Sequence, residues 1–320
     1  LEGQELYIST SIGISVYPEH ANDVESLMKQ ADVAMYAVKE GGKNNFRYFE
    51  TSMLEGATDK LKLEADLRHA LDPRVIQADT FTLHYQPQVD VTTGRMGGME
   101  GLARWNHLER GLLSSEEFVG IAEEANLMLP LGEYLLRSAC RQGADWLKRG
   151  VGLRVAVNLS ASQMRERELV TQVERVLSET KFPPEKLELE FTETAVMKDM
   201  AGAQAVMKAL HNIGVRLTID DFGAGASSVA QLRELSFDCV KLKRSFIQDI
   251  LESERDHKLV AALIFLANAM GAQVVAEGVE SRKQCEVLAN LGCTVMQGQL
   301  FSLALSTQEI EGRFFAKKAA

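Results

Sequence analysis

The chain has 320 residues, of which 46% are hydrophobic and 25% are charged. This composition is typical of a globular protein and excludes a disordered or fibrous chain, and the length allows one large domain or two ordinary ones. The 45 acidic residues outnumber the 35 basic ones and give a net charge of −10. Because DNA and RNA polymers need a broad basic surface, this charge argues against them as partners. A small anionic ligand held through metal ions is compatible with it.

Cysteines and apolar stretches indicate the compartment. The four cysteines form no C-x-x-C pair, which excludes the usual zinc and disulfide patterns. The longest apolar stretch, residues 259–270, is too short to cross a bilayer, so we expect no membrane contact from this segment. No basic and apolar leader precedes the first elements, and we expect a cytoplasmic location, with any membrane anchor of the full-length protein lying upstream. Because Leu1 already falls next to a predicted strand, we expect a fragment of a longer protein.

The N-terminal part predicts a short α/β segment. Residues 6–16 alternate in polarity as a strand does, and residues 45–49 predict a second strand. Between them, residues 24–40 place apolar side chains at helical spacing up to Gly41-Gly42, which predicts a helix that ends there. Residues 51–71 are charged and Leu-periodic and predict a connecting helix. The three elements before this connection bury too little apolar surface to fold as a domain of their own.

From residue 81 onward, short apolar runs alternate with segments of helical length. The runs lie at 81–85, 95–99, 153–157, 187–189, 216–219, 237–240, 273–276 and 293–296. Helical segments include 131–148, 161–179, 201–212 and 246–269. Eight such repeats favour an α/β fold, a closed (β/α)8 barrel of about 250 residues. The first two runs are joined by residues 90–94 alone, which is too short for a helical crossover, so we expect that pair to be antiparallel.

A polar residue follows each of these eight runs, and Asp221 adds a second carboxylate beside the fifth of them. The residues are Gln86, Glu100, Asn158, Glu190, Asp220, Lys241, Glu277 and Gln297. Because the C-terminal strand ends of such a barrel converge on one mouth, we expect these side chains to face one another. Crowded carboxylates repel, and one lysine does not balance them. Acids and an amide without His or Cys favour two Mg²⁺ or Mn²⁺ ions over zinc. Two such ions, about 3.5–4 Å apart, activate a water for attack on a phosphodiester.

A simpler interpretation applies to any one of these positions. A single acid after a strand is usually a helix N-cap or a turn residue, although capping does not require acids or amides at every strand end. Gly223-Ala224-Gly225 is compatible with a phosphate-binding turn but is more typical of a tight βα loop. The six histidines are scattered, and we expect them in packing or at the surface.

The barrel segment also carries short motifs in a fixed order. They are Tyr85-Gln86-Pro87, Glu100-Gly101-Leu102 with Arg104-Trp105, Asn158-Leu159-Ser160, EFTE at 190–193, Asp220-Asp221-Phe222-Gly223, AEGVE at 276–280 and Gln297-Gly298. From residue 63 to 304 the series resembles the EAL family of cyclic di-GMP phosphodiesterases. Residues 1–50, with motifs at 11–14, 31–36 and 44–45, resemble the C-terminal end of a GGDEF diguanylate cyclase domain without its signature loop. We therefore expect a partial α+β GGDEF fragment at 1–50, a helical linker at 51–75 and an EAL barrel at 76–320, and no cyclase activity from this chain alone.

The EAL resemblance implies a fold, a reaction and partners. The fold is a (β/α)8 barrel with an antiparallel first strand. The reaction is the metal-dependent hydrolysis of cyclic di-GMP to linear pGpG in bacterial second-messenger signalling. The implied partners are cyclic di-GMP, a second copy bound through the barrel as a homodimer, and upstream GGDEF and sensory domains in the full-length protein.

The resemblance also implies a role for individual residues. One Mg²⁺ or Mn²⁺ ion would be held by Glu100, Asn158, Glu190 and Asp220, and the other by Asp220, Asp221 and Glu277. The residues with implied catalytic roles are Lys241, which would contact the nucleophilic water, Glu277, Gln297, and Glu193, which would brace the loop after Asp221. Those that would contact the dinucleotide are Gln86, Leu102 and Arg104, and Glu280 is the outer glutamate of AEGVE.

Several positions depart from the family pattern. Gly101 replaces the signature Ala, and Ala224 and Ala226 replace a hydroxyl and an aromatic residue in the loop after Asp221. Lys243 and Thr294 stand where the family usually has acids. None of these changes removes an implied metal ligand, which favours an active enzyme. The alternatives are a catalytically weak or inactive EAL domain that acts as a cyclic di-GMP receptor, and an unrelated barrel metallohydrolase without affinity for this nucleotide.

Overall fold

The computed structural model describes residues 9–40, 44–166, 168–225 and 227–315, and the chain divides into two compact units, Leu1–Asp72 and Pro73–Ala320. The start of the strand predicted over residues 6–16, the predicted helix end at Gly41-Gly42 and Ala226 lie outside the described residues. Each unit is described by itself.

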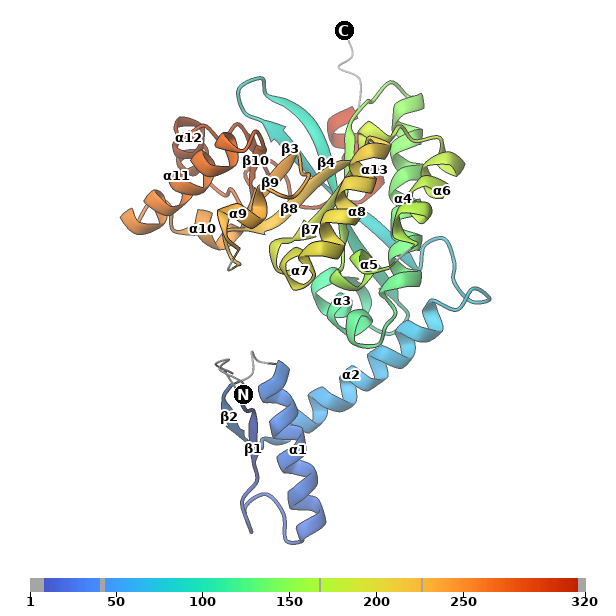
Figure 1. Cartoon of the computed structure of the whole chain (residues 1–320). Helices are drawn as coiled ribbons and strands as arrows, with labels where there is room; N and C mark the ends of the chain where they lie inside the picture. The colour runs from blue at the N-terminus through green and yellow to red at the C-terminus, as the bar shows by residue number, and fades with distance from the viewer. Residues whose placement is uncertain (1–8, 41–43, 167, 226, 316–320) are drawn as a thin grey trace. The chain divides into compact units, whose positions relative to one another are not determined.

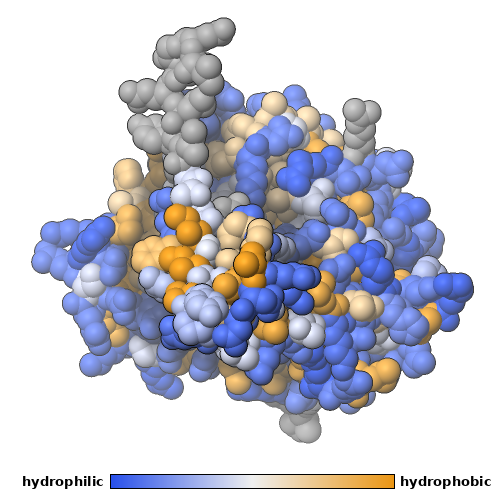
Figure 2. All heavy atoms as spheres, turned by 90° about the horizontal axis from the view of Figure 1, so that it is seen from below, coloured by the Kyte–Doolittle hydropathy of each residue, from blue (hydrophilic) through white to orange (hydrophobic). Residues whose placement is uncertain are grey.

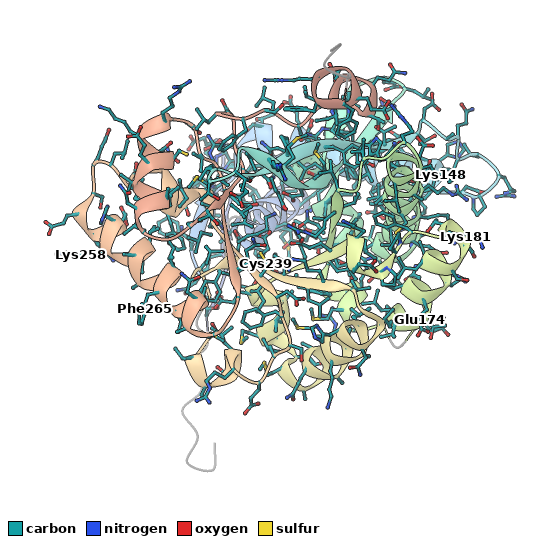
Figure 3. The ribbon with its side chains drawn as sticks, turned by 90° about the horizontal axis from the view of Figure 1, so that it is seen from above. Lys148, Glu174, Lys181, Cys239, Lys258 and Phe265 are labelled. Atoms are coloured by element: carbon teal, nitrogen blue, oxygen red, sulfur yellow. The ribbon has the colours of Figure 1, made fainter. Side chains whose placement is uncertain are left out.

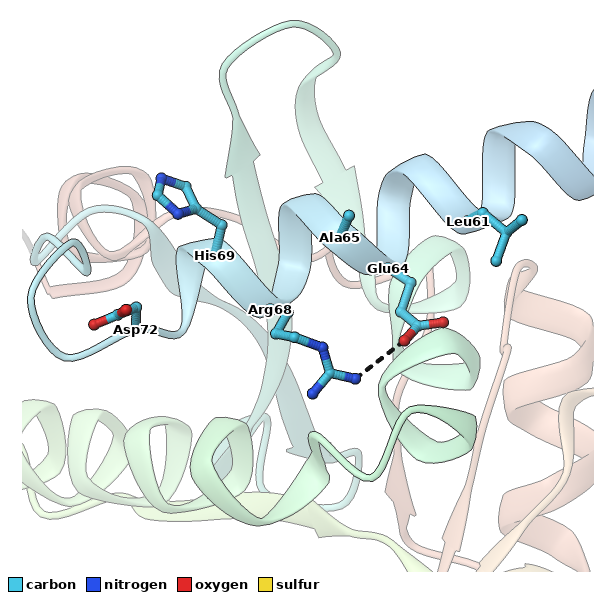
Figure 4. Close-up of a pocket in the computed structure, with 6 residues that line it drawn as sticks. All are labelled: Leu61, Glu64, Ala65, Arg68, His69 and Asp72. Atoms are coloured by element: carbon cyan, nitrogen blue, oxygen red, sulfur yellow. Dashed lines mark hydrogen bonds and ion pairs between the residues drawn. The ribbon is translucent and has the colours of Figure 1, made fainter.

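In the first unit, β1 (Ile12–Ile14) and β2 (Phe46–Tyr48) pair in parallel, and α1 (Val24–Glu40) contacts both strands (Figure 1). Ala34 and Val38 on α1 are buried. Helix α2 (Thr51–Ala70) follows and carries an open surface depression, shown in Figure 4, where Arg68 pairs with Glu64 at 3.0 Å. None of the predicted site residues lines this depression.

The second unit is a closed mixed barrel of eight strands, as predicted. The strands are β3 (Phe81–Asp90), β4 (Arg95–His107), β6 (Arg154–Leu159), β7 (Leu187–Thr192), β8 (Arg216–Phe222), β9 (Cys239–Leu242), β10 (Gln273–Ala276) and β11 (Val295–Met296). From β4 through β11 the neighbours are parallel, whereas β3 pairs antiparallel with both β4 and β11. The short link at 90–94 thus makes a hairpin, which confirms the antiparallel first strand. A further strand, β5 (Gly111–Ser114), pairs antiparallel with β4.

Helices surround this barrel. They are α3 (Ser115–Glu124), α4 (Met128–Lys148), α5 (Ala161–Met164), α6 (Leu169–Thr180), α7 (Glu193–Lys198), α8 (Met200–Ile213), α9 (Val229–Leu232), α10 (Arg244–Gln248), α11 (Glu254–Ala269), α12 (Arg282–Asn290) and α13 (Thr307–Ile310), with a 3-10 turn η1 (Pro184–Lys186) and a π turn η2 (Glu311–Phe315). Helices α4, α6 and α8 pack in sequence on one side, and α11 packs against β10 (Figure 1). Figure 3 places Cys239 within the ring of strands, whereas Lys148, Glu174, Lys181 and Lys258 extend from the outer helices.

Local signals explain why helices begin where they do. Helices α5, α9, α12 and α13 each start with a capping box, in which a Ser side chain accepts from the N3 backbone and a Gln or Glu at N3 accepts from the Ser backbone. Two segments predicted as single helices are each divided in two. Segment 161–179 becomes α5 and α6, and segment 246–269 contributes to α10 and α11, where Ser253 caps a new helix by accepting from the Asp256 amide at 3.1 Å.

The barrel interior combines apolar and polar layers. Cys239, Val275 and Val295 form a buried apolar cluster.

The face drawn in Figure 2 is largely hydrophilic, with apolar side chains in small groups. Within the described ranges, the structure contains no helix with the length and apolarity needed to span a bilayer.

Candidate active site

The predicted site assembles around Lys241 on β9. In the strand register Lys241 lies opposite Val275, and alternation places its side chain on the same inward face as Cys239. The residue is completely buried. A buried ammonium is costly unless opposite charges surround it, so the barrel must supply carboxylates at this level.

Three carboxylates from three other strands meet the Lys241 ammonium. Its Nζ donates to Glu190 Oε2 at 2.8 Å and to Glu100 Oε2 at 2.9 Å, and it pairs with Glu277 Oε1 at 2.6 Å. Glu190 comes from β7, Glu100 from β4, and Glu277 directly follows β10. Because Asn158 pairs with Glu190 in register on the next strand, β6 adds its amide at the same level.

Amide side chains complete the ring. Asn158 Nδ2 donates to Glu100 Oε1 at 2.7 Å, and Gln297 Nε2 donates to Glu100 Oε2 at 2.6 Å and to Gln86 Oε1 at 2.9 Å. Gln86 Nε2 in turn donates to the Ser302 carbonyl at 3.0 Å. A chain of hydrogen bonds therefore connects Gln86, a residue predicted to contact a ligand, to the carboxylate of Glu100.

Electrostatics in this ring are strained by excess negative charge. Burial raises the pKa of Glu190 well above its ordinary value, and the nearby Glu100 charge adds to this effect. Burial likewise raises the pKa of Asp220, and it raises that of Glu277 to about 7 although Lys241 acts in the opposite direction. For Lys241 the sign is reversed, because burial favours the neutral amine but the charges of Glu100, Glu190 and Glu277 outweigh it and raise the pKa.

Asp220 and Asp221 lie near the end of strand β8, next to this ring. The Asp221 amide donates to Asp220 Oδ1 at 2.7 Å. Asp221 adopts a left-handed backbone conformation with φ of 54°, which is uncommon for a residue with a side chain. Its carboxylate pairs with the Lys243 ammonium at 3.1 Å rather than with Lys241. In the sequence, Lys243 stands two residues after Lys241, at a position where the family usually has an acid. This departure from the family pattern was the signal that could have drawn attention to Lys243.

Glu193, predicted to brace the loop after Asp221, contacts that loop in the structure. Its Oε2 accepts from the Gly223 amide at 2.7 Å, and its Oε1 accepts from the Ser227 hydroxyl. The carboxylate is buried. A Cβ at Gly225 would come within 2.5 Å of Glu193 Oε1, so the loop packs closely onto this side chain.

The remaining predicted residues lie outside the ring. Leu102 and Arg104 follow Glu100 on β4 at alternate positions, so they share its face, and both are partly exposed. Arg104 Nη1 donates to the Ala103 carbonyl at 2.8 Å. Glu280 forms an exposed ion pair with Arg244 at 2.6 Å and does not join the carboxylates around Lys241.

A second polar cluster lies inside the barrel, two residues earlier on β7. Glu188 is buried, and its Oε2 lies 3.2 Å from Arg154 Nε and 3.3 Å from Arg216 Nε, while its Oε1 accepts from Thr218 at 2.6 Å. Sequence reasoning missed this cluster. The signal was the alternation of Leu187, Glu188, Leu189 and Glu190, which points both acids inward.

The donor chemistry of the mouth fits hard divalent cations. Among the described residues no group of three or more His, Cys, Asp or Glu side chains stands in a metal-holding arrangement, and three of the carboxylates instead contact the Lys241 ammonium. Yet the buried Glu190 Oε1 and Gln297 Oε1 have no hydrogen-bond partner in the described part of the chain. Carboxylate and amide oxygens are the ligands that Mg²⁺ and Mn²⁺ prefer. The orphaned acceptors therefore leave room in the donor set for a cation.

Fold and site together define a barrel protein with an acidic polar mouth at the strand ends. The EAL domain model matches residues 64–304, and the chain belongs to the EAL family, whose members are generally metal-dependent. The diguanylate cyclase GGDEF domain model matches residues 1–45. The three-part division at residues 50 and 75 stays a prediction.

The chain is similar to curated proteins that are named for their action on cyclic di-GMP. The cyclic di-GMP phosphodiesterase PdeR of Escherichia coli is 37% identical over 298 residues, which cover 93% of this chain and 44% of that protein. The bifunctional diguanylate cyclase/cyclic di-GMP phosphodiesterase MucR of Pseudomonas aeruginosa is 38% identical over 307 residues, which cover 96% of this chain and 44% of that protein. The chain thus spans less than half the length of these relatives.

Solved structures share the barrel. A phosphodiesterase structure named PaMucR, in complex with c-di-GMP, superimposes with a TM-score of 0.73 at 37% identity and covers 78% of this chain and 99% of that chain. The EAL enzyme Bd1971, bound to cAMP and cyclic di-GMP, gives a TM-score of 0.74 at 26% identity and covers 91% of this chain and 76% of that chain.

Proposed function

We propose that the chain hydrolyses cyclic di-GMP to linear pGpG with two divalent cations, Mg²⁺ or Mn²⁺, bound at the barrel mouth. The observation that carries this proposal is the convergence of Glu100, Glu190 and Glu277 on one buried ammonium, with all three oxygens within 2.9 Å of Lys241 Nζ. The named activities of PdeR and MucR support the choice of substrate.

Two ligand sets would hold the cations. Glu100, Asn158, Glu190 and Asp220 would hold one ion, and Asp220, Asp221 and Glu277 the other. When bound, such ions would lower the pKa of a water and balance charge on the phosphate. The raised pKa values of Glu190, Asp220 and Glu277 support this assignment, because burial makes these carboxyl groups resist ionisation and an added cation would stabilise their charged form.

The chain's own side chains would position the reactants. Lys241 would keep its proton, and its ammonium would orient the attacking water through a hydrogen bond. The Gln297 carboxamide would fix the positions of the Glu100 and Gln86 side chains through the hydrogen bonds described above. Arg104 would pair with a phosphate of the dinucleotide, since a guanidinium matches two phosphate oxygens. Attack of the water oxygen on phosphorus would break the P–O3′ bond, and the departing oxygen would take up a proton.

A receptor role is the second candidate, and a specific observation favours it. The Lys241 and Lys243 ammonium groups already neutralise carboxylates that would ligate the cations. A chain in which these ion pairs persist would bind cyclic di-GMP and hydrolyse it slowly or not at all, and a partner would read the bound state. In either role, upstream GGDEF and sensory domains of a longer protein and a second copy bound through the barrel are the proposed partners.

One assay separates the two roles. The chain is incubated with cyclic di-GMP in the presence and absence of Mn²⁺, and the nucleotides are separated by chromatography. The enzyme releases pGpG with Mn²⁺ and not with a chelator, and Glu100→Ala abolishes the product while Lys258→Ala, in an exposed ion pair with Glu254, leaves it unchanged. Binding of the nucleotide without product formation would establish the receptor, and absence of binding would refute both roles.

A further inference from the structure

The Lys243 ammonium pairs with Asp221, which is a proposed ligand of the second cation. It follows the last residue of β9, and its Nζ lies 3.1 Å from Asp221 Oδ2. The Lys243 side chain is 43% exposed and the Asp221 side chain is 32% exposed. This pair therefore differs from the Lys241 cluster, where the ammonium is buried and meets three carboxylates.

The backbone around Asp221 is fixed by other contacts. Its amide donates to Asp220 Oδ1, and the amide of Gly223, two residues on, donates to the buried Glu193 carboxylate at 2.7 Å. These bonds hold Asp221 in its left-handed conformation. The Asp221 carboxylate thus has a defined position, and Lys243 is the cation that the structure places against it.

We propose that Lys243 is an internal competitor for the second divalent cation, so that binding of this ion to Asp221 requires displacement of the Lys243 ammonium. This inference rests on the proposed function, which assigns Asp221 to the second ligand set. Two effects act in the same direction. The cation must break the existing ion pair, and the displaced ammonium stays tethered nearby and repels it.

The competition acts on one of the two ions. The first ligand set, Glu100, Asn158, Glu190 and Asp220, does not include the partner of Lys243. Lys243 therefore weakens the second ion alone, which binds less tightly than it would to the same ligands without this ammonium. Because the pair is partly exposed and screened by solvent, the expected effect is modest, about fivefold in the dissociation constant of the second ion.

The test measures Mn²⁺ binding directly, without substrate. Calorimetric titration gives the affinity of each ion, and electron paramagnetic resonance distinguishes a single Mn²⁺ from a coupled pair. Lys243→Ala should tighten the second ion about fivefold, Lys243→Glu should tighten it further, and Lys243→Arg should leave it close to wild type. A structural role for the side chain would not follow the sign of the charge in this way.

A matched control and distinct outcomes make the test decisive. Lys258→Ala removes a lysine from another exposed ion pair, on an outer helix (Figure 3), and should not change either affinity. Two Mn²⁺ ions that bind equally well to wild type, Lys243→Ala and Lys243→Glu would overturn the inference and leave the proposed function standing. Failure of the wild type and all variants to bind any Mn²⁺ would overturn the metal centre itself.

Discussion

Replacing Lys241 by Met tests the charge balance of the mouth independently of any activity. The substitution keeps a long apolar side chain in a completely buried position and removes the ammonium on which three carboxylates converge. Breaking a buried ion pair by removing one partner typically costs about 3–5 kcal/mol. We expect the low end, about 3 kcal/mol, because Glu190 and Glu277 already have raised pKa values and take up protons readily.

The corresponding melting shift depends on metal. For a unit of this size a loss of 1 kcal/mol lowers Tm by roughly 2–4 °C, so Lys241→Met should melt about 6–12 °C lower in the presence of a chelator. Added Mn²⁺ should recover much of this loss, since a cation at one hundred times its dissociation constant contributes about 2.7 kcal/mol. Wild type should gain less, because its own ammonium competes for the same oxygens.

Thermal melts with chelator and with Mn²⁺ measure both effects. Lys258→Met is the control, since it changes an exposed lysine in the same way and should stay within about 0.5 kcal/mol of wild type. The reasoning fails if Lys241→Met and wild type have the same Tm in the presence of the chelator. It also fails if Mn²⁺ raises the Tm of both proteins by the same amount.

Three further outcomes follow from the same contacts. Glu193→Ala removes the acceptor for the Gly223 amide. It should make the loop after Asp221 more sensitive to limited proteolysis and lower the free energy of unfolding in urea by about 1–3 kcal/mol. Protease resistance equal to that of wild type would contradict this prediction. Glu188→Ala leaves Arg154 and Arg216 without their shared carboxylate and should lower the free energy of unfolding by about 3 kcal/mol. A loss below about 1 kcal/mol, the contribution of an exposed ion pair, would refute this prediction. A chelator should stop pGpG release and excess Mn²⁺ should restore it, whereas release that persists in chelator would exclude the metal mechanism.

The barrel was predictable because its signals are local and repeated. Strand β10 coincides with the predicted run at 273–276, and the short link at 90–94 predicted the antiparallel first pair. Segments 161–179 and 246–269 show where periodicity alone fails. At the second break Ser253 caps a new helix, and a long-window pattern does not resolve so short a signal.

The sequence predicted which strand-end residues would lie together, but it did not predict all of their individual partners. Strand-end positions predicted that Glu100, Glu190 and Glu277 would meet, and they do so at Lys241. The partner of Asp221 was not predictable, because it depends on a left-handed backbone at Asp221 that no residue type at that position requires. The contact of Glu193 with Gly223 spans 30 positions of sequence, and only the family resemblance led us to expect it.

Strand β7 shows why charge balance, and not the number of acids, distinguishes the mouth from the rest of the interior. Glu188 and Glu190 point inward from the same strand, and both are buried. Glu188 meets two guanidinium groups and a hydroxyl, whereas Glu190 shares one ammonium with two other carboxylates and, among the described residues, keeps Oε1 without a partner. At the earlier level two guanidinium groups balance the charge of one acid. The later level lacks this balance, and only there would a divalent cation add stability when it binds.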